Sequence, residues 1–288
     1  MDSGVHGEAF AVPTAGETII RGVRHGQGPP LVLLHGGPGC YDYFDNSALA
    51  GWLAAAYSVY SYDQRGCRRS ASAGPFTIEA NVDDLDAIRR WAGTERLSLL
   101  GHSAGAILAL FYAVAHAERV ERIVLMSPAG LKPGWRKPFD TTIRERLTRP
   151  QKEQLADIDR RILRTADPAE RAELYRDRFN AALPCYVDPC HRELAPALEF
   201  YDREVNVQTS ASALDAYDEA LFRTRLSRVG DRVGIMHGRS DPIPWRVVDD
   251  LLRLLPTARV VPLERCGHFP WLEEPDACRE ALLTFLSR

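Results

Sequence analysis

The chain has 288 residues, a length that one α/β domain with an inserted subdomain can fill. Its formal net charge is only −3, so there is no basic excess to bind nucleic acid. No apolar run approaches the roughly 20 residues of a membrane-spanning helix, and the opening residues lack a basic stretch followed by an apolar one. We therefore expect a soluble, cytoplasmic protein with no nucleic-acid partner and no membrane partner.

The first part of the chain alternates predicted strands with loops and a helix. Strands are predicted at 17–24 and 30–34, where β-branched and other apolar residues cluster. The second strand stops at the glycine-rich run 35–39, which predicts a loop. A third strand at 57–62 is followed by a helix at 78–92, in which apolar residues recur at helical intervals.

The same alternation continues along the chain. We predict further strands at 97–101, 120–128, 232–238 and 258–263, and helices at 104–117, near 245–255 and from about 275 onward. Strands that alternate with helices form a mostly parallel sheet with helices on both faces. The predicted fold class is therefore α/β.

Between residues 130 and 228 the strand pattern disappears. Helical stretches rich in Arg, Asp and Glu replace it, interrupted at Pro150, Pro168, Pro184, Pro189 and Pro196. We interpret 130–228 as a helical cap, or lid, inserted into a catalytic domain that consists of 1–129 and 229–288.

A catalytic motif follows the strand predicted at 97–101. Residues Gly101–Gly105 read G-x-S-x-G and stand directly between a predicted strand and a predicted helix. A sharp strand-to-helix turn holds the serine of such a motif in a strained conformation, and its small neighbours let the backbones approach. Ser103 is the predicted nucleophile.

A serine hydroxyl needs a base, and the base needs an acid that orients it. His268 follows the last predicted strand and Asp241 follows the strand before it, both at the sheet edge where α/β folds build their sites. Another location for the acid, after strand 120–128, offers no carboxylate. Asp241 precedes Pro242, so a purely turn-forming role stays open for it.

The tetrahedral intermediate of acyl transfer needs N–H donors for its oxyanion. The backbone N–H of Ala104, next to the nucleophile, is one predicted donor. The glycine turn after strand 30–34 supplies the other: Gly37 is the first choice, Gly36 is the alternative, and Pro38 has no N–H to give.

Other residues in these motifs are predicted to be structural. His35 and His102 are expected to hydrogen-bond the glycine loop and to pack beside Ser103, and Asp63 and Arg65 are expected to pair with each other and brace their loop.

The six cysteines are expected to be free thiols, and Cys40, Cys67 and Cys266 to be small buried hydrophobic residues. A bond between Cys185 and Cys190 would form only in an oxidising compartment. No spacing typical of a metal site occurs, so no metal and no cofactor are expected.

Four sequence runs together resemble the prolyl iminopeptidase family of α/β-hydrolases: His35–Gly39 (HGGPG), Asp63–Cys67 (DQRGC), Gly101–Gly105 (GHSAG) and Gly267–His268. The resemblance covers the catalytic domain and leaves the cap unmatched. It implies the α/β-hydrolase fold and an exopeptidase that releases N-terminal residues, proline in particular, without a metal or an organic cofactor.

Two features depart from that family. Ala104 follows the nucleophile where the family usually has an aromatic residue, and Pro242 follows the acid where some members carry a second acidic residue. The family binds the free amine of its substrate through acidic residues of the cap. The cap carboxylates here include Asp202 and Asp218, and the candidates for substrate binding are Glu193, Glu199, Glu204 and Glu219.

The leading function is a serine peptidase or amidase that forms an acyl-enzyme on a small-molecule or peptide substrate. A repurposed hydrolase of the same fold is the alternative: an esterase, a lactonase, an endopeptidase or a tailoring hydrolase of a peptide-derived or natural-product substrate. A non-catalytic binding protein comes third, because the chain retains a serine, a histidine and an acid at the expected places. The missing amine-binding signature predicts a poor or narrow prolyl aminopeptidase, with substrate choice set by the cap.

Overall fold

The computed structural model describes residues 7–45 and 47–287. The sequence argument about the opening residues, that they lack a basic stretch followed by an apolar one, concerns in part residues 1–6, which lie outside the described part. Among the described residues, no helix is both long enough and apolar enough to cross a membrane.

An eight-stranded sheet forms the centre of the described part of the molecule, in the order β1-β2-β4-β3-β5-β6-β7-β8. The strands from β3 to β8 pair in parallel, whereas β1 and β2 form an antiparallel edge. Their bounds are β1 Glu8–Pro13, β2 Ile19–His25, β3 Pro30–Leu34, β4 Ser58–Tyr62, β5 Leu97–His102, β6 Val120–Met126, β7 Val233–Gly238 and β8 Arg259–Leu263. The predicted α/β class with a mostly parallel sheet is confirmed.

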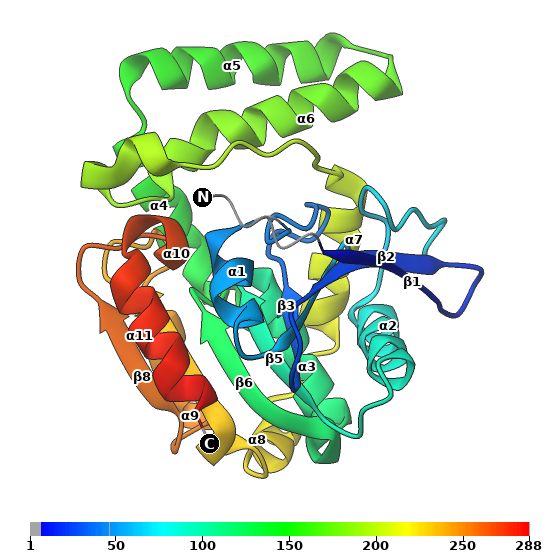
Figure 1. Ribbon diagram of the computed structural model, residues 1–288. Helices are drawn as coiled ribbons and strands as arrows, with labels where there is room; N and C mark the ends of the chain where they lie inside the picture. Colours follow the sequence, from blue (N-terminus) through cyan, green and yellow to red (C-terminus); the bar gives the residue numbers. More distant parts are fainter. Residues whose placement is uncertain (1–6, 46, 288) are drawn as a thin grey trace, which may run out of the picture.

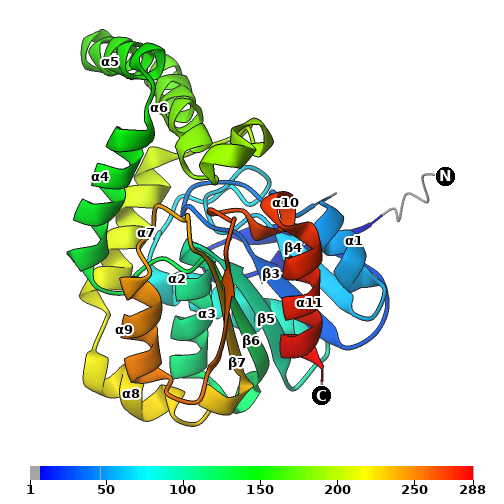
Figure 2. The same cartoon turned by 90° about the vertical axis from the view of Figure 1, so that its left-hand side faces the viewer.

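Helices cover both faces of the sheet, as Figure 2 shows. One face carries α2 (Ile78–Trp91), α3 (Ala104–Ala115), α8 (Glu219–Leu226) and α9 (Arg246–Leu254) over one apolar core. The other face carries α1 (Ala48–Ala54) and α11 (Pro275–Leu286) over a second core, with the short α10 (Pro270–Glu273) beside them. Since both faces are covered, every residue of β5 is buried, including its polar Ser98 and His102.

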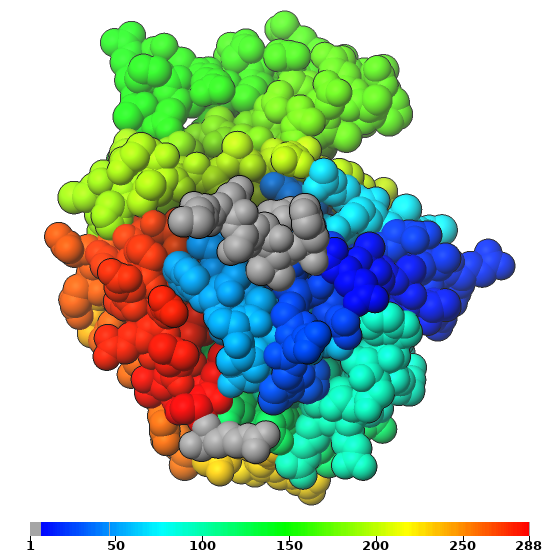
Figure 3. All heavy atoms as spheres, viewed as in Figure 1, coloured from blue at the N-terminus to red at the C-terminus, as the bar shows by residue number. Residues whose placement is uncertain are grey.

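Between β6 and β7 the chain is helical, as predicted. Helices α4 (Arg136–Arg146), α5 (Arg149–Arg164) and α6 (Pro168–Ala182) form an insertion, and α5 and α6 lie at the top of the molecule (Figure 1, Figure 3). Pro150 and Pro168 stand in the first turns of α5 and α6, where a missing N–H costs no hydrogen bond.

The later part of this segment lies against the sheet layers. Helix α7 (Arg203–Asp215) contacts α2, and α8 contacts α3. Phe222 and Leu226 of α8 are buried in the same core as α3. The division of the chain at 130 and 228 stays a prediction.

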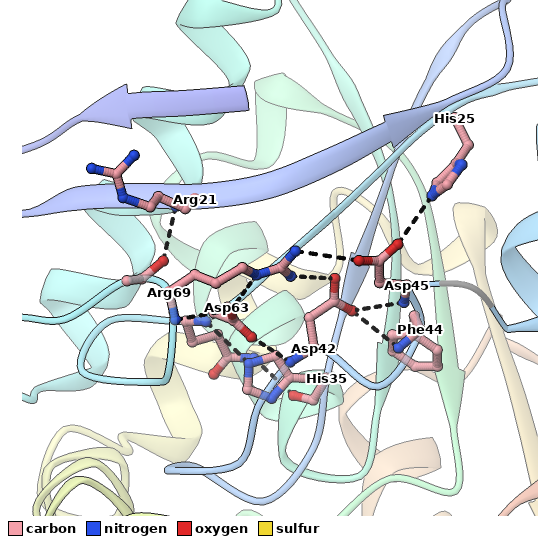
Figure 4. Close-up of polar contacts among 10 residues, drawn as sticks. Arg21, His25, His35, Asp42, Phe44, Asp45, Asp63 and Arg69 are labelled. Carbon is pink, nitrogen blue, oxygen red and sulfur yellow. Dashed lines mark hydrogen bonds and ion pairs between the residues drawn. The ribbon is translucent and has the colours of Figure 1, made fainter. Parts of the chain in front are cut away.

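The expected pair of Asp63 with Arg65 is wrong. Asp63 accepts a hydrogen bond from Nε of Arg69 at 2.5 Å, and Arg69 also reaches Asp42 and Asp45 (Figure 4). Nε of Arg65 instead donates to Asp84 of α2 at 2.9 Å, and both side chains are buried. In a loop, residues two apart need not face each other. Asp63 therefore pairs with Arg69, six residues further along the same loop, and Arg65 pairs with α2.

A second charged cluster ties α2 to the segment after α3. Asp86 accepts hydrogen bonds from Arg89 at 2.7 Å, and Arg119 lies 2.9 Å from the same oxygen. Burial by itself would raise the pKa of Asp86, but these two arginines lower it to about 2. The ionised carboxylate is therefore favoured in the folded state.

We expect Asp86→Asn to lower the free energy of unfolding by about 1 kcal/mol at pH 7, once solvent screening of the partly exposed cluster is allowed for. Because the folded-state pKa lies below the ordinary 3.8, this stabilisation is complete above about pH 5 and disappears as the pH falls toward 2. Urea denaturation at pH 7 and pH 3 should show the difference shrinking to about half. Asp83→Asn, an exposed aspartate of the same helix, is the control. An equal difference at both pH values would contradict this assignment.

Candidate active site

Ser103 occupies the sharp turn between β5 and α3. Its backbone has φ 55° and ψ −118°, a conformation that L-residues rarely adopt. The turn is tight: a Cβ added to Gly105 would lie 2.1 Å from the carbonyl oxygen of Leu34, and one added to Gly101 would lie 2.4 Å from that of Gly105. The G-x-S-x-G motif therefore has the strand, turn and helix that the sequence predicted for it.

His268 and Asp241 lie together at the carboxyl ends of the sheet strands. Nδ1 of His268 is 2.8 Å from Oδ2 of Asp241, and both side chains are buried. The other oxygen of Asp241 accepts the N–H of Ile243 at 2.8 Å, so this carboxylate also forms the turn. The turn-forming role and the histidine contact thus coexist, one on each carboxylate oxygen.

The charge state of Asp241 suits an orienting acid. Burial by itself would raise its pKa, but the nearby His268 and His237 and the hydrogen bonds from His268 and Ile243 hold the pKa below its usual range. An ionised carboxylate accepts the proton on Nδ1 of His268, which leaves Nε2 of that ring as the nitrogen that can act as a base.

A buried glutamate that sequence reasoning missed holds the histidine loop. Glu273 of α10 accepts the N–H groups of Gly267 and Phe269, on either side of His268, at 2.7 and 2.8 Å. It also accepts the N–H of Asp188, from the segment between β6 and β7, at 2.7 Å. The N–H of His268 itself donates to the carbonyl of Tyr186 at 2.9 Å. The loop that carries His268 is thus held both by α10 and by the segment between β6 and β7.

A hydrogen-bond chain joins the glycine loop to the histidine loop. The N–H of Gly36 donates to the hydroxyl of Tyr43, and that hydroxyl lies 2.5 Å from Nδ1 of His102. Nε2 of His102 lies 2.7 Å from the carbonyl of His268. Since a carbonyl only accepts, Nε2 of His102 carries the proton and Nδ1 accepts from Tyr43. His102 is therefore structural, as predicted, whereas no sequence signal marked Tyr43.

His35 is also structural. Its Nδ1 bonds the carbonyl of Gly36 at 3.0 Å, and its Nε2 accepts the N–H of Gln64 at 3.1 Å. These contacts fix the start of the glycine loop against the loop after β4. The N–H of Gly36, the alternative oxyanion donor, already donates to Tyr43. The N–H groups of the other two predicted donors, Gly37 and Ala104, have no acceptor among the described residues.

Ser103 and His268 line one cavity of about 250 Å³, together with Gly37 and Ala104. We call it the main cavity. Its opposite wall is largely aromatic and comes from the segment between β6 and β7, with the side chains Trp135, Phe139, Phe179, Tyr186 and Tyr201. Among the described residues that line it there is no Asp or Glu, and Arg136 is the one Arg or Lys.

The four predicted substrate-binding glutamates lie elsewhere among the described residues. Glu199 pairs with Arg68 at 2.9 Å, and Glu219 pairs with Lys132 at 2.6 Å. Glu204 accepts a hydrogen bond from Gln208 of its own helix, and Glu193 is exposed. None of the four lines the main cavity. Their role in substrate binding stays a prediction.

All six cysteines are free thiols in the described chain. Cys40, Cys67 and Cys266 are buried as predicted, Cys185 is buried and Cys190 is exposed. Burial raises the pKa of the Cys40 thiol to about 12, so this cavity-lining sulfur stays protonated. The described residues contain no group of three or more His, Cys, Asp or Glu side chains placed to hold a metal ion.

Comparison with known proteins agrees with this arrangement. The model of the family described as "Alpha/beta hydrolase family" matches residues 31–281, which is most of the chain. The chain belongs to the alpha/beta hydrolase family. The sheet order, the serine turn and the helical insertion α4–α6 described above are thus those of an α/β-hydrolase fold.

Relatives of this α/β-hydrolase include a proline iminopeptidase of Heyndrickxia coagulans, 23% identical over 97% of this chain and 98% of that protein. Proline iminopeptidase PfmaB of Pestalotiopsis fici is 36% identical, but the match spans 35% of this chain and 37% of that protein. Among solved structures, an esterase from Exiguobacterium antarcticum has a TM-score of 0.65 at 17% identity, covering 96% of this chain and 99% of that one. The last likeness concerns the fold alone.

Proposed function

We propose that this protein is a serine hydrolase that cleaves an ester or amide bond through an acyl-enzyme on Ser103. One observation carries the proposal: the strained Ser103 and the Asp241-bound His268 line the same cavity. A nucleophile, a base with one free nitrogen and an acid that orients the base are the parts that acyl transfer needs.

In the acylation step, Oγ of Ser103 forms a bond to the substrate's carbonyl carbon while its proton passes to Nε2 of His268. The carbonyl oxygen becomes an oxyanion, which the N–H groups of Gly37 and Ala104 stabilise. When this tetrahedral intermediate collapses, the bond from the carbon to the leaving oxygen or nitrogen breaks. Nε2 of His268 returns the proton to that leaving atom.

In the deacylation step, water takes the place of the leaving group. His268 accepts a proton from the water as its oxygen adds to the acyl carbon, and the proton then goes to Oγ of Ser103 as the ester bond breaks. The net reaction consumes one water and releases an acid and an alcohol or amine. Asp241 keeps the ring of His268 in one orientation throughout both steps.

We propose further that the substrate needs no free amine. A buried ammonium group without a carboxylate partner costs several kcal/mol. The described lining of the main cavity contains no Asp or Glu, and it contains the cation Arg136. Both features disfavour an N-terminal ammonium group beside Ser103. The opposite candidate, a proline iminopeptidase, is favoured by the name of the relative that matches over nearly its full length.

The two candidates predict opposite substrate preferences. We expect prolyl p-nitroanilide to be no better a substrate than its N-acetylated form, and p-nitrophenyl acetate to be hydrolysed at least as fast as either. The measurement is kcat/KM for the three compounds, with the Ser103→Ala protein giving the background rate. A preference for the free amine of about 100-fold or more, equivalent to about 2.7 kcal/mol, would instead establish the iminopeptidase.

A further inference from the structure

A second hollow opens beside the nucleophile, on the side of Ala104. It has a volume of about 70 Å³ and lies between α2, α3 and α7. We call it the side lobe, and its apolar lining includes Ile78, Ile107, Leu108, Leu131, Ala213 and Leu214. It shares with the main cavity a wall formed by Pro38, Ala104, Ala129, Trp135, Arg136 and Ser210.

The side lobe offers a substrate little hydrogen bonding. Of its polar lining residues, Gln64 donates to the carbonyl of His35 at 2.8 Å, and Asn81 donates to that of Thr77 at 2.8 Å. The hydroxyl of Thr209 donates to the carbonyl of Phe76 at 3.2 Å. These three donors are used within the protein. Arg136 and Ser210 lie on the wall shared with the main cavity, and the guanidinium of Arg136 stacks over Trp135 at 5.0 Å. Most of the remaining lining is apolar, so the lobe away from that wall favours hydrocarbon over polar groups.

The chemistry of the site decides which part of a substrate faces this lobe. The leaving atom receives its proton from His268, so the leaving group has to lie on the side of His268. His268 lines the main cavity and does not line the side lobe. Ala104, whose N–H is a proposed oxyanion donor, lies at the junction of the two. The acyl part, on the far side of the carbonyl from the leaving group, therefore points toward the side lobe.

We propose that the side lobe is the acyl-chain site and that it takes a short aliphatic acyl chain. This inference rests on the proposed serine hydrolase function and names its substrate class: esters or amides of short aliphatic acids, with the leaving group held by the aromatic wall of the main cavity. Ala104, the residue after Ser103, lines both cavities, and its side chain is a single methyl group.

The first test is a series of p-nitrophenyl esters with acetyl, butanoyl, hexanoyl and decanoyl groups. Burial of each added methylene should raise kcat/KM about fourfold until the lobe is filled. We expect kcat/KM to rise from acetate to butanoate and to fall again by decanoate, because the lobe is small. A flat series or a steady rise through decanoate would overturn the assignment.

The second test fills the lobe. Ala213→Phe should lower the ratio of kcat/KM for butanoate over acetate at least about tenfold, because the new ring occupies the space of the added methylenes. Ala211→Phe is the matched control: it lies two residues earlier on α7, is exposed, and should keep the wild-type ratio. Equal loss on both esters in a folded Ala213→Phe protein would contradict the inference.

An enlarging variant covers the case in which Ala213→Phe fails to fold. Leu214→Ala should move the best chain toward hexanoate, and Leu221→Ala, a comparably exposed leucine on α8, should not. Each protein is also treated with a fluorophosphonate, and labelling of Ser103 is read by mass spectrometry. Labelling with no shift in chain preference overturns the side lobe alone, whereas a wild-type protein without labelling overturns the proposed function itself.

Discussion

Ser103→Ala should lower kcat for the best ester by about three to six orders of magnitude, with little change in the unfolding temperature. The reason is that, in the proposed mechanism, Oγ of Ser103 forms the acyl bond, so the variant loses its nucleophile. The measurement is steady-state hydrolysis, with the uncatalysed rate subtracted. Fluorophosphonate labelling should disappear in the same variant.

The control for this variant is Ser287→Ala, an exposed serine after α11, which should keep both the rate and the labelling. Near-normal turnover by the Ser103→Ala protein would remove Ser103 from the mechanism and leave the strained turn without a catalytic purpose. Thermal unfolding of both variants separates a lost nucleophile from a lost fold.

Most of the sheet could be predicted because buried strands appear in the sequence as short apolar runs. The predicted strands 30–34, 97–101 and 232–238 match β3, β5 and β7 within one residue at each end. The elements that were missed are β1, which is a sheet edge, and the short helices α1 and α10. A four-residue helix such as α10 is too short to show a helical period.

The candidate triad could be predicted because it depends on chain order and on the positions of strand ends, both of which can be read from the sequence. The residues that hold the loops around the triad could not be predicted. Glu273 and Tyr43 act on backbone groups whose positions depend on the tertiary fold, and nothing in their local sequence distinguishes them from other acidic or aromatic residues. The wrong pair of Asp63 with Arg65 has the same origin, because nearness in sequence was taken as nearness in space.

The residues that select the substrate were the feature that the sequence indicated least well. The cap carboxylates were candidates for an amine site because the resemblance to prolyl iminopeptidases implies acidic residues in the cap, but the charged residues of amphipathic helices mostly face solvent. In the structure, Glu199 and Glu219 pair with basic residues away from the cavity. The side lobe is formed by helices distant in sequence, α2, α3 and α7, so no single motif could indicate it.

Asp241→Asn should separate the two contacts of this side chain. An asparagine oxygen can still accept the N–H of Ile243, so the turn should persist, but the amide cannot provide the negative charge that holds His268 and stabilises its protonated form. We expect kcat to fall by about 10⁴-fold at neutral pH with the fold intact.

Asp188→Asn is a matched control. Like Asp241, Asp188 precedes a proline, and its side chain accepts the N–H of the residue two positions later, Cys190, at 2.8 Å. Its carboxylate has no hydrogen bond to a histidine among the described residues. The Asp188→Asn substitution should change kcat by less than about threefold, because no hydrogen bond joins the carboxylate of this buried residue to His268. An unaffected rate in Asp241→Asn would make that aspartate a turn-former alone, and the orienting acid for His268 would have to be another carboxylate. A comparable loss in both variants would show that the turn, and not the histidine contact, accounts for the effect. A large loss in Asp241→Asn alone would establish the orienting role, because the two substitutions alter the same kind of turn and only one removes the charge beside His268.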